Sequence, residues 1–396
     1  MCFKDYYWCI LKSPSFFRRN YMVEIKKIDT TSKREVEEFV KFPFQLYKDT
    51  PQWVPPIQAD IKTMLNKNKH PYYEHSDAEF FTARQNGDIV GRIGLLENKS
   101  YNKHHNKKQA SFYLFESIDD QTIAQKIFTH AFEWCHARKL DYLLGPKGFS
   151  PFDGYGVVVE GFEHRQMMTM MNYNKPNYPK FLEQIGFKKE VDWVSCYTRL
   201  DEFKMPEKIH LIANKVQENG AFQVVRFEKK SELRKWAWRI GQAYNNTFVN
   251  NWEYYPLTDN EIKFTLDNIM VVAIPQLIKV ITRNDKVVGF LLAFPDISKA
   301  LQRHNGTLQP WALVDYLREL KRTNWISFNG VGVLPEYHGR GGNALLFSEI
   351  EKTARSFHFE HAELTQIAET AVQMRKDLEN LGVTPYKNHR IYGMKI

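Results

Sequence analysis

The sequence predicts an α/β (α+β) protein built from two similar domains in tandem, each with a mixed sheet. A length of 396 residues, 43% of them hydrophobic and 14% aromatic, suits two buried cores. Strand-like and helix-like patterns alternate along the chain. The third observation is a repeat, because Gly91 and Gly289 follow matching hairpin patterns 198 residues apart, and the helix-ending Gly186 and Gly382 lie 196 residues apart. Near-equal offsets at two places indicate a duplicated domain.

Residues 1–21 read as an N-terminal extension that is not part of the native chain, because a clean strand pattern at 23–28 opens directly after Met22. A basic arm on a membrane surface is the alternative for this segment. The first domain is then expected over residues 22–203. Residues 32–42 predict a short helix, and Pro43, Pro51, Pro55 and Pro56 predict an extended segment after it.

The rest of the first domain follows from local signals. Asn86-Gly87 predicts a type I′ turn between strands at 80–84 and 89–96. Apolar residues recur with helical spacing from Ile123 to Trp134, after a capping sequence at 117–120. Further strands are expected at 109–115, 142–144 and 193–200, and a further helix at 178–185. A long additional stretch at 147–171 is an insertion or lid candidate.

The second domain, over residues 204–396, repeats this order. Asn284-Asp285 predicts the turn of a hairpin between residues 277–282 and 287–290. Residues 297–323 form a separate insertion, with a helix-like pattern at 311–320. Before this hairpin, residues 204–276 are expected to hold a strand and one or more helices, as in the first domain, without assigned bounds.

Residues 329–346 run from an apolar strand through a glycine-rich loop into an amphipathic helix, and they predict a diphosphate-binding site. Gly339, Gly341 and Gly342 allow the backbone positive φ and close approach to a ligand. The first-turn N–H groups of the helix and the positive end of its dipole would face the same anion, with His338 and Arg340 as additional donors. A plain glycine-rich turn is the alternative, since such patterns are weak on their own.

Charge and cysteine content limit the possible partners and compartment. The net charge of +9 favours anionic partners, but no basic run interleaved with aromatic residues indicates a nucleic-acid face. The four cysteines lack metal-ligand spacing and are too few for a disulfide framework, which fits a cytoplasmic protein. No apolar run approaches the roughly 18 residues needed to span a bilayer. We therefore expect neither a membrane partner nor a metal, and His358 and His361 lack a recognised ligand arrangement.

At the glycine-rich loop the sequence resembles the GNAT superfamily of N-acetyltransferases, whose signature is Gln or Arg, two residues, Gly, one residue, then Gly or Ala. Residues 338–343 occupy these six places, and the resemblance extends over residues 23–396. It implies two tandem GNAT-like domains, each with a mixed, mainly antiparallel twisted sheet flanked by helices. The first copy is degenerate, because Ser117, Asp119 and Asp120 stand where its phosphate loop should lie, without a glycine.

The resemblance implies an acyl-CoA-dependent N-acyltransferase, with acetyl-CoA or another acyl-CoA as cosubstrate and a small-molecule or peptide amine as acceptor. Cofactor binding would fall to the second copy. The residues concerned are Val331, Val333, His338, Gly339, Arg340, Gly341, Gly342, Asn343 and Ala344.

Residues for proton transfer are candidates from their predicted positions on strands, not from a motif. Glu363 on the predicted fifth strand is the candidate base, and Tyr386 or Tyr392 the candidate acid. The sequence departs from the family at His338 and Asn343, and Leu378 stands where family members often carry a Tyr. These departures leave two alternatives open. One is a non-catalytic acyl-CoA-binding or scaffold protein, and the other a tandem aminoacyl or peptidyl transferase that uses charged tRNA.

Overall fold

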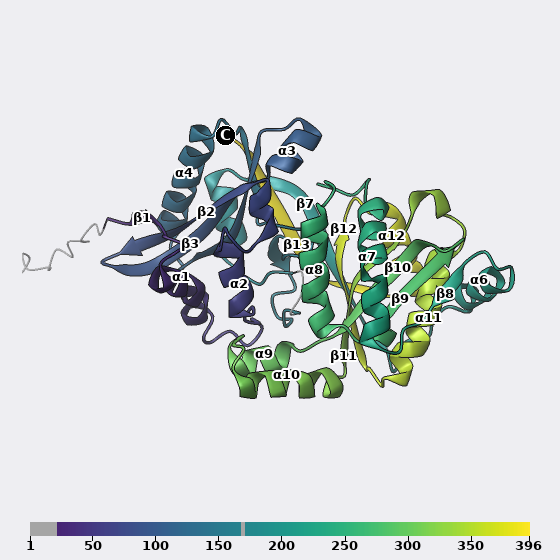
Figure 1. Ribbon diagram of the computed structural model, residues 1–396. Helices are drawn as coiled ribbons and strands as arrows, with labels where there is room; N and C mark the ends of the chain where they lie inside the picture. Colours follow the sequence, from purple (N-terminus) through teal and green to yellow (C-terminus); the bar gives the residue numbers. More distant parts are fainter. Residues whose placement is uncertain (1–21, 168–170) are drawn as a thin grey trace, which may run out of the picture.

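The computed structural model describes residues 22–167 and 171–396, and its strands join into one continuous sheet. Figure 1 shows this sheet running through both halves of the molecule, with helices packed on its faces. The predicted extension at 1–21 lies outside the described residues. Along the sheet the strand order is β1-β2-β3-β4-β5-β13-β7-β12-β11-β10-β9-β8, and β6 pairs with β13. Most neighbours are antiparallel, but β4 with β5 and β11 with β12 are parallel, so the predicted mixed α/β sheet is confirmed.

The strands are β1 Glu24–Lys27, β2 Asp77–Gln85, β3 Asp88–Glu97, β4 Gln109–Ser117, β5 Tyr142–Gly145, β6 Val157–Glu160, β7 Lys188–Arg199, β8 Gln223–Val225, β9 Ile278–Arg283, β10 Lys286–Pro295, β11 Trp325–Val333, β12 His361–Ala368 and β13 Thr384–Lys395. The α-helices are α1 Lys33–Leu46, α2 Gln58–Leu65, α3 Lys99–His105, α4 Gln121–Ala137, α5 Tyr178–Ile185, α6 Glu207–Glu218, α7 Lys230–Thr247, α8 Asp259–Val272, α9 Ser298–His304, α10 Pro310–Arg322, α11 Gly342–Ser356 and α12 Val372–Leu381. Three 3₁₀ turns are η1 Pro71–Glu74, η2 Pro275–Leu277 and η3 Pro335–Tyr337.

Neighbouring side chains on each strand supply cores on opposite faces of the sheet, as the two-residue strand period requires. In the first half, Phe80 packs with residues of α1, and Phe81 packs with residues of α4. In the second half, Phe290 belongs to the core under α7, and Leu291 to the core under α11. The sheet is therefore covered by helices on both faces in each half.

The two halves exchange their last strands. The C-terminal strand β13 lies between β5 and β7, so it joins the sheet of the first half. Conversely, β7 pairs with β12 of the second half, with His361 opposite Arg199 and Leu364 opposite Cys196. A division at residues 203 and 204 follows the sequence repeat, whereas the hydrogen-bonded sheet crosses between the halves at β13 and β7.

The predicted helix end before Pro43 is wrong, because α1 continues through Pro43 to Leu46. Proline has no N–H, so the carbonyl of Phe39 loses its partner within the helix. The buried side chain of Arg92 replaces that partner, donating from Nη1 to the Phe39 carbonyl at 2.8 Å. A tertiary hydrogen bond thus offsets part of the cost of proline inside the helix.

Candidate functional site

The glycine-rich loop leads from η3 into α11 and leaves the start of that helix open. Gly339 and Gly341 adopt positive φ angles of 72° and 80°, a region that a side chain would make costly. Gly341 is the N-cap of α11 and provides no side-chain hydrogen bond to it. The first-turn N–H groups of this 15-residue helix therefore lack both an intrahelical partner and a side-chain cap. Such an end suits an anion.

The equivalent helix start in the first half is closed. Asp120 is the N-cap of α4, and its Oδ1 accepts a hydrogen bond from the N–H of Thr122 at 2.8 Å. The neighbouring Asp119 accepts a hydrogen bond from Asn177. A carboxylate therefore occupies the start of α4, where a phosphate group would have to bind. The sequence predicts this arrangement, because the first copy has Asp119 and Asp120 in place of a glycine-rich loop.

Strands β11 and β12 separate beside the loop. In the described part of the chain, their parallel ladder runs from Trp325 opposite His361 to Phe328 opposite Leu364. The ladder stops at Phe328, although Asn329 Nδ2 still donates to Thr365 Oγ1 of β12 at 3.4 Å. Within the described residues, 330–333 of β11 have no ladder partner in β12. On its other side β11 contains a bulge, because Leu292 pairs with Gly330 and Ala293 with Phe328, so that Asn329 is an additional residue.

Gln366 marks the same separation on β12. Its φ is 56°, a rare conformation for a residue with a long side chain. The register of β12 with β7 also shifts between Leu364 and Ile367. Backbone strain of this kind persists where the surroundings impose it and clusters at functional sites.

A single cavity of about 1100 Å³ joins the loop, the separated strands and the interface between the halves. The loop and α11 contribute His338, Gly339, Gly341, Gly342, Asn343 and Ala344; β11 and β12 contribute residues 328–333 and 364–367. The far end is aromatic, with Tyr155 and Trp193 from the first half and Tyr244, Phe248, Trp252 and Tyr255 from the second. The cavity therefore has the open helix end on one side and aromatic side chains on the other.

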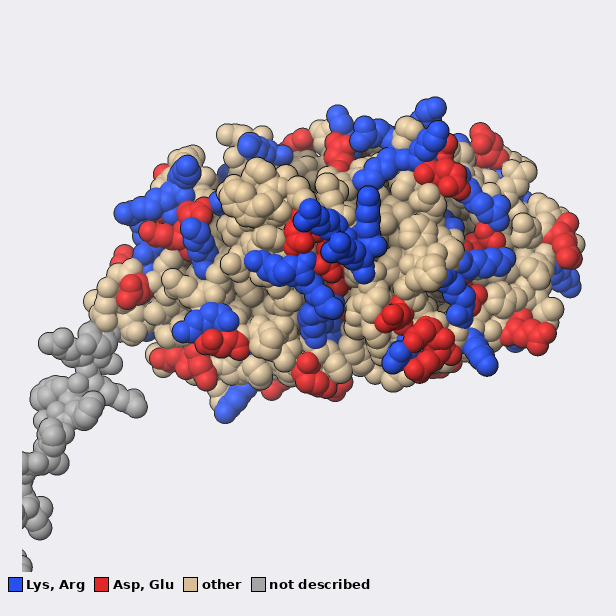
Figure 2. Space-filling view, turned by 90° about the horizontal axis from the view of Figure 1, so that it is seen from below, with Lys and Arg blue, Asp and Glu red and all other residues tan. Residues whose placement is uncertain are grey.

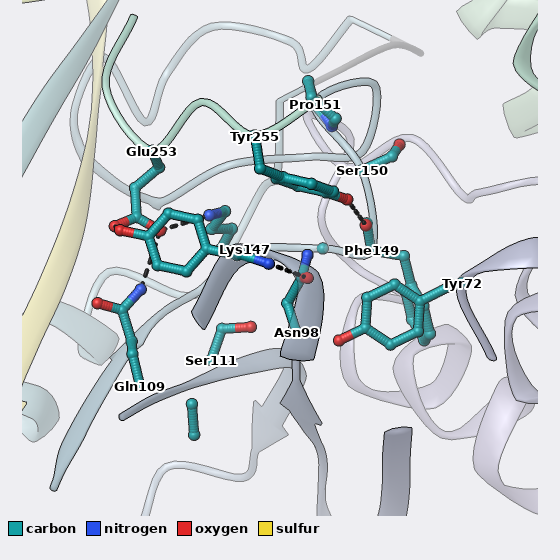
Figure 3. A pocket seen from close by; sticks show the side chains of 13 residues that line it. Tyr72, Asn98, Gln109, Ser111, Lys147, Phe149, Ser150, Pro151, Glu253 and Tyr255 are labelled. Atoms are coloured by element: carbon teal, nitrogen blue, oxygen red, sulfur yellow. Dashed lines mark hydrogen bonds and ion pairs between the residues drawn. The ribbon is translucent and has the colours of Figure 1, made fainter. Parts of the chain in front are cut away.

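A small pocket of about 20 Å³, large enough for one water molecule, adjoins the aromatic end and shares Pro151, Glu253 and Tyr255 with the cavity. Figure 3 shows Glu253 of the second half pointing toward Lys147 and Gln109 of the first. Its Oε2 accepts from Lys147 Nζ at 2.6 Å and from Gln109 Nε2 at 2.9 Å. Burial acts to raise the pKa of Glu253, but Lys147, the Tyr101 hydroxyl and Lys107 together outweigh burial and hold the pKa below its usual value. The ionised carboxylate thus links the halves at the cavity wall.

The structure brings together most of the predicted cofactor residues. Val331, Val333, His338, Gly339, Gly341, Gly342, Asn343 and Ala344 all line the cavity. Arg340 is exposed, with its guanidinium 5.4 Å from the ring centre of Tyr337. His338 hydrogen-bonds through Nε2 to the carbonyl of Val333 at 2.7 Å, and Asn343 Nδ2 donates to Asp377 at 3.1 Å. Both departures from the family signature therefore hold the loop in place.

The predicted acid and base residues lie elsewhere. Glu363 is fully buried, pairs with Lys387 at 2.8 Å and accepts from the hydroxyl of Tyr386 at 2.5 Å. It alternates along β12 with Ala362 and Leu364, which line the cavity. Tyr392 donates to Glu183 at 2.8 Å in the first half. Glu363, Tyr386 and Tyr392 are not among the described residues that line the cavity. The structure therefore gives no support for their roles as base and acid.

Other residues of the site carry no sequence signal that would have identified them. A positive φ at Gln366 cannot be read from a glutamine, and Trp252, Glu253 and Tyr255 lie in a segment whose elements were not assigned bounds. Tyr155 lies in the predicted insertion at 147–171, of which residues 168–170 are outside the described part. The described residues also contain no group of three His, Cys, Asp or Glu side chains placed to hold a metal.

Comparisons with known proteins extend over nearly the whole chain. No model of a protein family matches it. The chain is 25% identical over 376 residues to Protein YghO of Escherichia coli (strain K12), covering 92% of this chain and 94% of that protein. It is 22% identical over 376 residues to a protein named bacterial ceramide synthase from Caulobacter vibrioides, and the match covers 93% of this chain and 97% of that protein.

Two solved structures share its architecture. One is a tandem GNAT protein from the clavulanic acid biosynthesis pathway, with a TM-score of 0.56, 12% identity, and coverage of 94% of this chain and 98% of that one. The other is a fungal multi-domain GH3 β-N-acetylglucosaminidase that contains a GCN5-related glucosamine N-acetyltransferase region. It has a TM-score of 0.55 and 13% identity, and the match covers 94% of this chain and 38% of that one. The chain therefore has the fold of the tandem GNAT N-acetyltransferases.

Proposed function

We propose that this protein is an N-acyltransferase that moves an acyl group from acyl-CoA to an amine. One observation carries the proposal: the glycine-rich loop, the open N-terminus of α11 and the open edge of β11 line the same cavity. A cosubstrate that joins a diphosphate to a long, hydrogen-bonding arm needs these three features side by side.

Acyl-CoA would bind with its diphosphate on the N–H groups of residues 339–344, where the helix dipole adds attraction. Its pantetheine arm would pair with the edge of β11 from Val331 to Val333. The thioester then lies near the bulge at Asn329 and the strained Gln366. A hydrogen-bond donor of the protein beside the thioester carbonyl would polarise it, and this is the main electrostatic contribution that we expect from the protein.

The reaction would form one C–N bond and break one C–S bond. The free amine attacks the thioester carbonyl directly, the sulfur leaves as a thiol, and the amine loses a proton. Positioning of the two reactants in one cavity would supply much of the rate, because it makes the step effectively unimolecular.

The aromatic end of the cavity favours apolar reactants. An acetyl group needs little space, whereas the rings of Tyr155, Trp193 and Trp252 offer a wide apolar surface. A ceramide is an amide of a long-chain amino alcohol, and one relative carries the name of a ceramide synthase. We therefore propose a fatty acyl-CoA donor and a long-chain amine acceptor, in place of acetyl-CoA.

Thiol release and amide formation can be measured together. The purified chain would be incubated with acyl-CoAs from acetyl to palmitoyl, each with a short amine or a long-chain amino alcohol, and products identified by mass spectrometry. We expect amide in stoichiometric amounts with thiol, at least tenfold faster for the long-chain pair, because apolar burial contributes about 0.8 kcal/mol per methylene.

A charge placed on the β11 edge provides the control. Val331→Glu should abolish amide formation, whereas Val271→Glu on the exposed surface of α8 should leave it unchanged. Thiol release without any amide would contradict transfer to an amine, and equal rates for acetyl and palmitoyl donors would contradict the proposed chain length.

A further inference from the structure

The insertion between β10 and β11 folds into two helices that are anchored to the molecule by one side only. Ala312 and Tyr316 of α10 are buried with Val54, Ile297 and Leu301. On the flank, Arg303 of α9 pairs with Asp315 at 2.8 Å and Glu319 at 2.5 Å. These contacts fix α10 without any use of its outer face.

That outer face carries large apolar side chains in contact with solvent. Five of the twelve large hydrophobic side chains exposed in the described part of the chain fall between residues 308 and 317. Trp311 is 65% exposed and Leu317 is 61% exposed, and Val314 lies between them. Spacings of three residues place these side chains along one side of the helix. Leu308 and Leu313 are exposed beside them.

The charges on this face are all positive. Arg318 and Lys321 follow Val314 and Leu317 by four positions, so they lie among the apolar side chains, and Arg322 adjoins them; all three are exposed. In the described part of the chain, no carboxylate pairs with these three cations. Both acidic residues of α10, Asp315 and Glu319, turn to Arg303 of α9. Figure 2, seen from below, shows Lys and Arg side chains gathered in the middle of the face on which α9 and α10 lie.

We propose that the outer face of α10 docks on the surface of a bilayer rich in anionic lipid. An amphipathic helix with Trp and Leu on one side and cations among them lies in the interface plane, with its apolar side chains in the acyl boundary. Arg318, Lys321 and Arg322 would reach the phosphate headgroups with their long side chains. The complementary charge is the anionic lipid, which attracts each basic residue near the surface.

The pattern fits a lipid surface better than a protein partner. The centre of a protein interface is typically depleted in charged residues, whereas here Arg318 and Lys321 lie between the apolar side chains. Docking needs no membrane-spanning segment, and within the described residues no helix is long and apolar enough to cross a bilayer. The proposal departs from the expectation from sequence that the protein has no membrane partner, and the vesicle experiment below decides between the two.

This inference stands apart from the proposed reaction, because its test uses no substrate. The full chain would be sedimented with phosphatidylcholine vesicles and with vesicles containing one part in three phosphatidylglycerol. We expect binding to the anionic vesicles, weakened by added salt. Replacing Trp311 and Leu317 by Ser should reduce the apparent affinity more than about tenfold. Val271→Ser, at a side chain that is 69% exposed on α8, should change it little.

A matched pair of charge reversals separates docking by α10 from attraction by the overall charge. Arg318→Glu with Lys321→Glu should abolish binding, whereas Lys103→Glu with Lys108→Glu, at exposed positions in and after α3, should leave most of it. Equal losses in the two variants, or no binding of the unaltered chain to anionic vesicles, would overturn the proposal. A dimer detected by light scattering and dissociated by Leu317→Ser would also overturn it, because it would identify a second copy as the occupant.

Discussion

Individual residues of the site show how strain and hydrogen bonding combine. Gln366 holds a left-handed conformation that costs of order 1–3 kcal/mol, at the point where β12 leaves β11. Asn343 and His338 replace the usual residues of the loop signature, yet each has a partner that fixes the loop. These hydrogen bonds hold the loop in one conformation before any ligand is bound.

Histidine 389 gives a residue-scale prediction about pH. Burial lowers the pKa of His389 to about 3, with Lys387 adding to the effect, whereas an unfolded histidine titrates near 6.5. Between these values the unfolded chain binds a proton that the folded chain does not. Stability is therefore fully present above pH 6.5 and is lost as pH falls, by up to about 1.4 kcal/mol per pH unit.

Urea unfolding at pH 7.5 and pH 5 would measure this loss. His389→Gln can still donate to the carbonyl of Asn172, as Nε2 does now at 2.9 Å, but it cannot titrate. The variant should lose roughly 2 kcal/mol less than the unaltered chain between the two pH values. The same loss in both proteins would show that His389 does not contribute.

At the scale of elements, the sequence predicts those whose signals are local. Asn86-Gly87 and Asn284-Asp285 do form hairpin turns, with positive φ at all four residues. Gly186 and Gly382 do end α5 and α12 in the left-handed conformation. In contrast, α1 passes its proline because Arg92, from a distant strand, donates to Phe39. No local pattern contains that information.

Helices α6, α7 and α8 were expected only as unplaced helices before the second hairpin, although α6 and α7 help to enclose the cavity. In α6 the residues Ile209, Ile212, Ala213 and Val216 have the i, i+3, i+4, i+7 spacing of an amphipathic helix, so the sequence did carry a signal for this helix. The glycine loop was predictable because its chemistry is local. The aromatic end of the cavity was not predictable from local sequence, because it forms only where the insertion of the first half meets residues 244–257 of the second half.

The molecule as a whole is held together by the exchange of β7 and β13. Without β13, the first half would expose the edges of β5 and β7, which now pair with it. Unpaired edges of this kind invite aggregation or pairing with another chain. The two halves are therefore interdependent, and the cavity between them inherits that dependence.

Separate expression of the halves tests this interdependence. We expect residues 22–203 and 204–396 to be insoluble or aggregated when each is produced alone, and to form a soluble one-to-one complex when co-expressed, as size-exclusion chromatography would show. A monomeric first half with its own cooperative thermal transition would contradict the account of the exchanged strands.

The central claim is that the loop of the second half holds the diphosphate of acyl-CoA, and Gly339 tests it most directly. A Cβ atom added at Gly339 would meet no other atom within 4 Å, and Asn and Asp both tolerate positive φ better than most residues. Gly339→Asn and Gly339→Asp therefore differ essentially in charge. In calorimetric titrations with CoA, we predict that the Asn variant binds within about threefold of the unaltered chain, and that the Asp variant binds more than about tenfold more weakly because its carboxylate opposes the phosphates. Equal affinity of the Asp and Asn variants for CoA would contradict the claim.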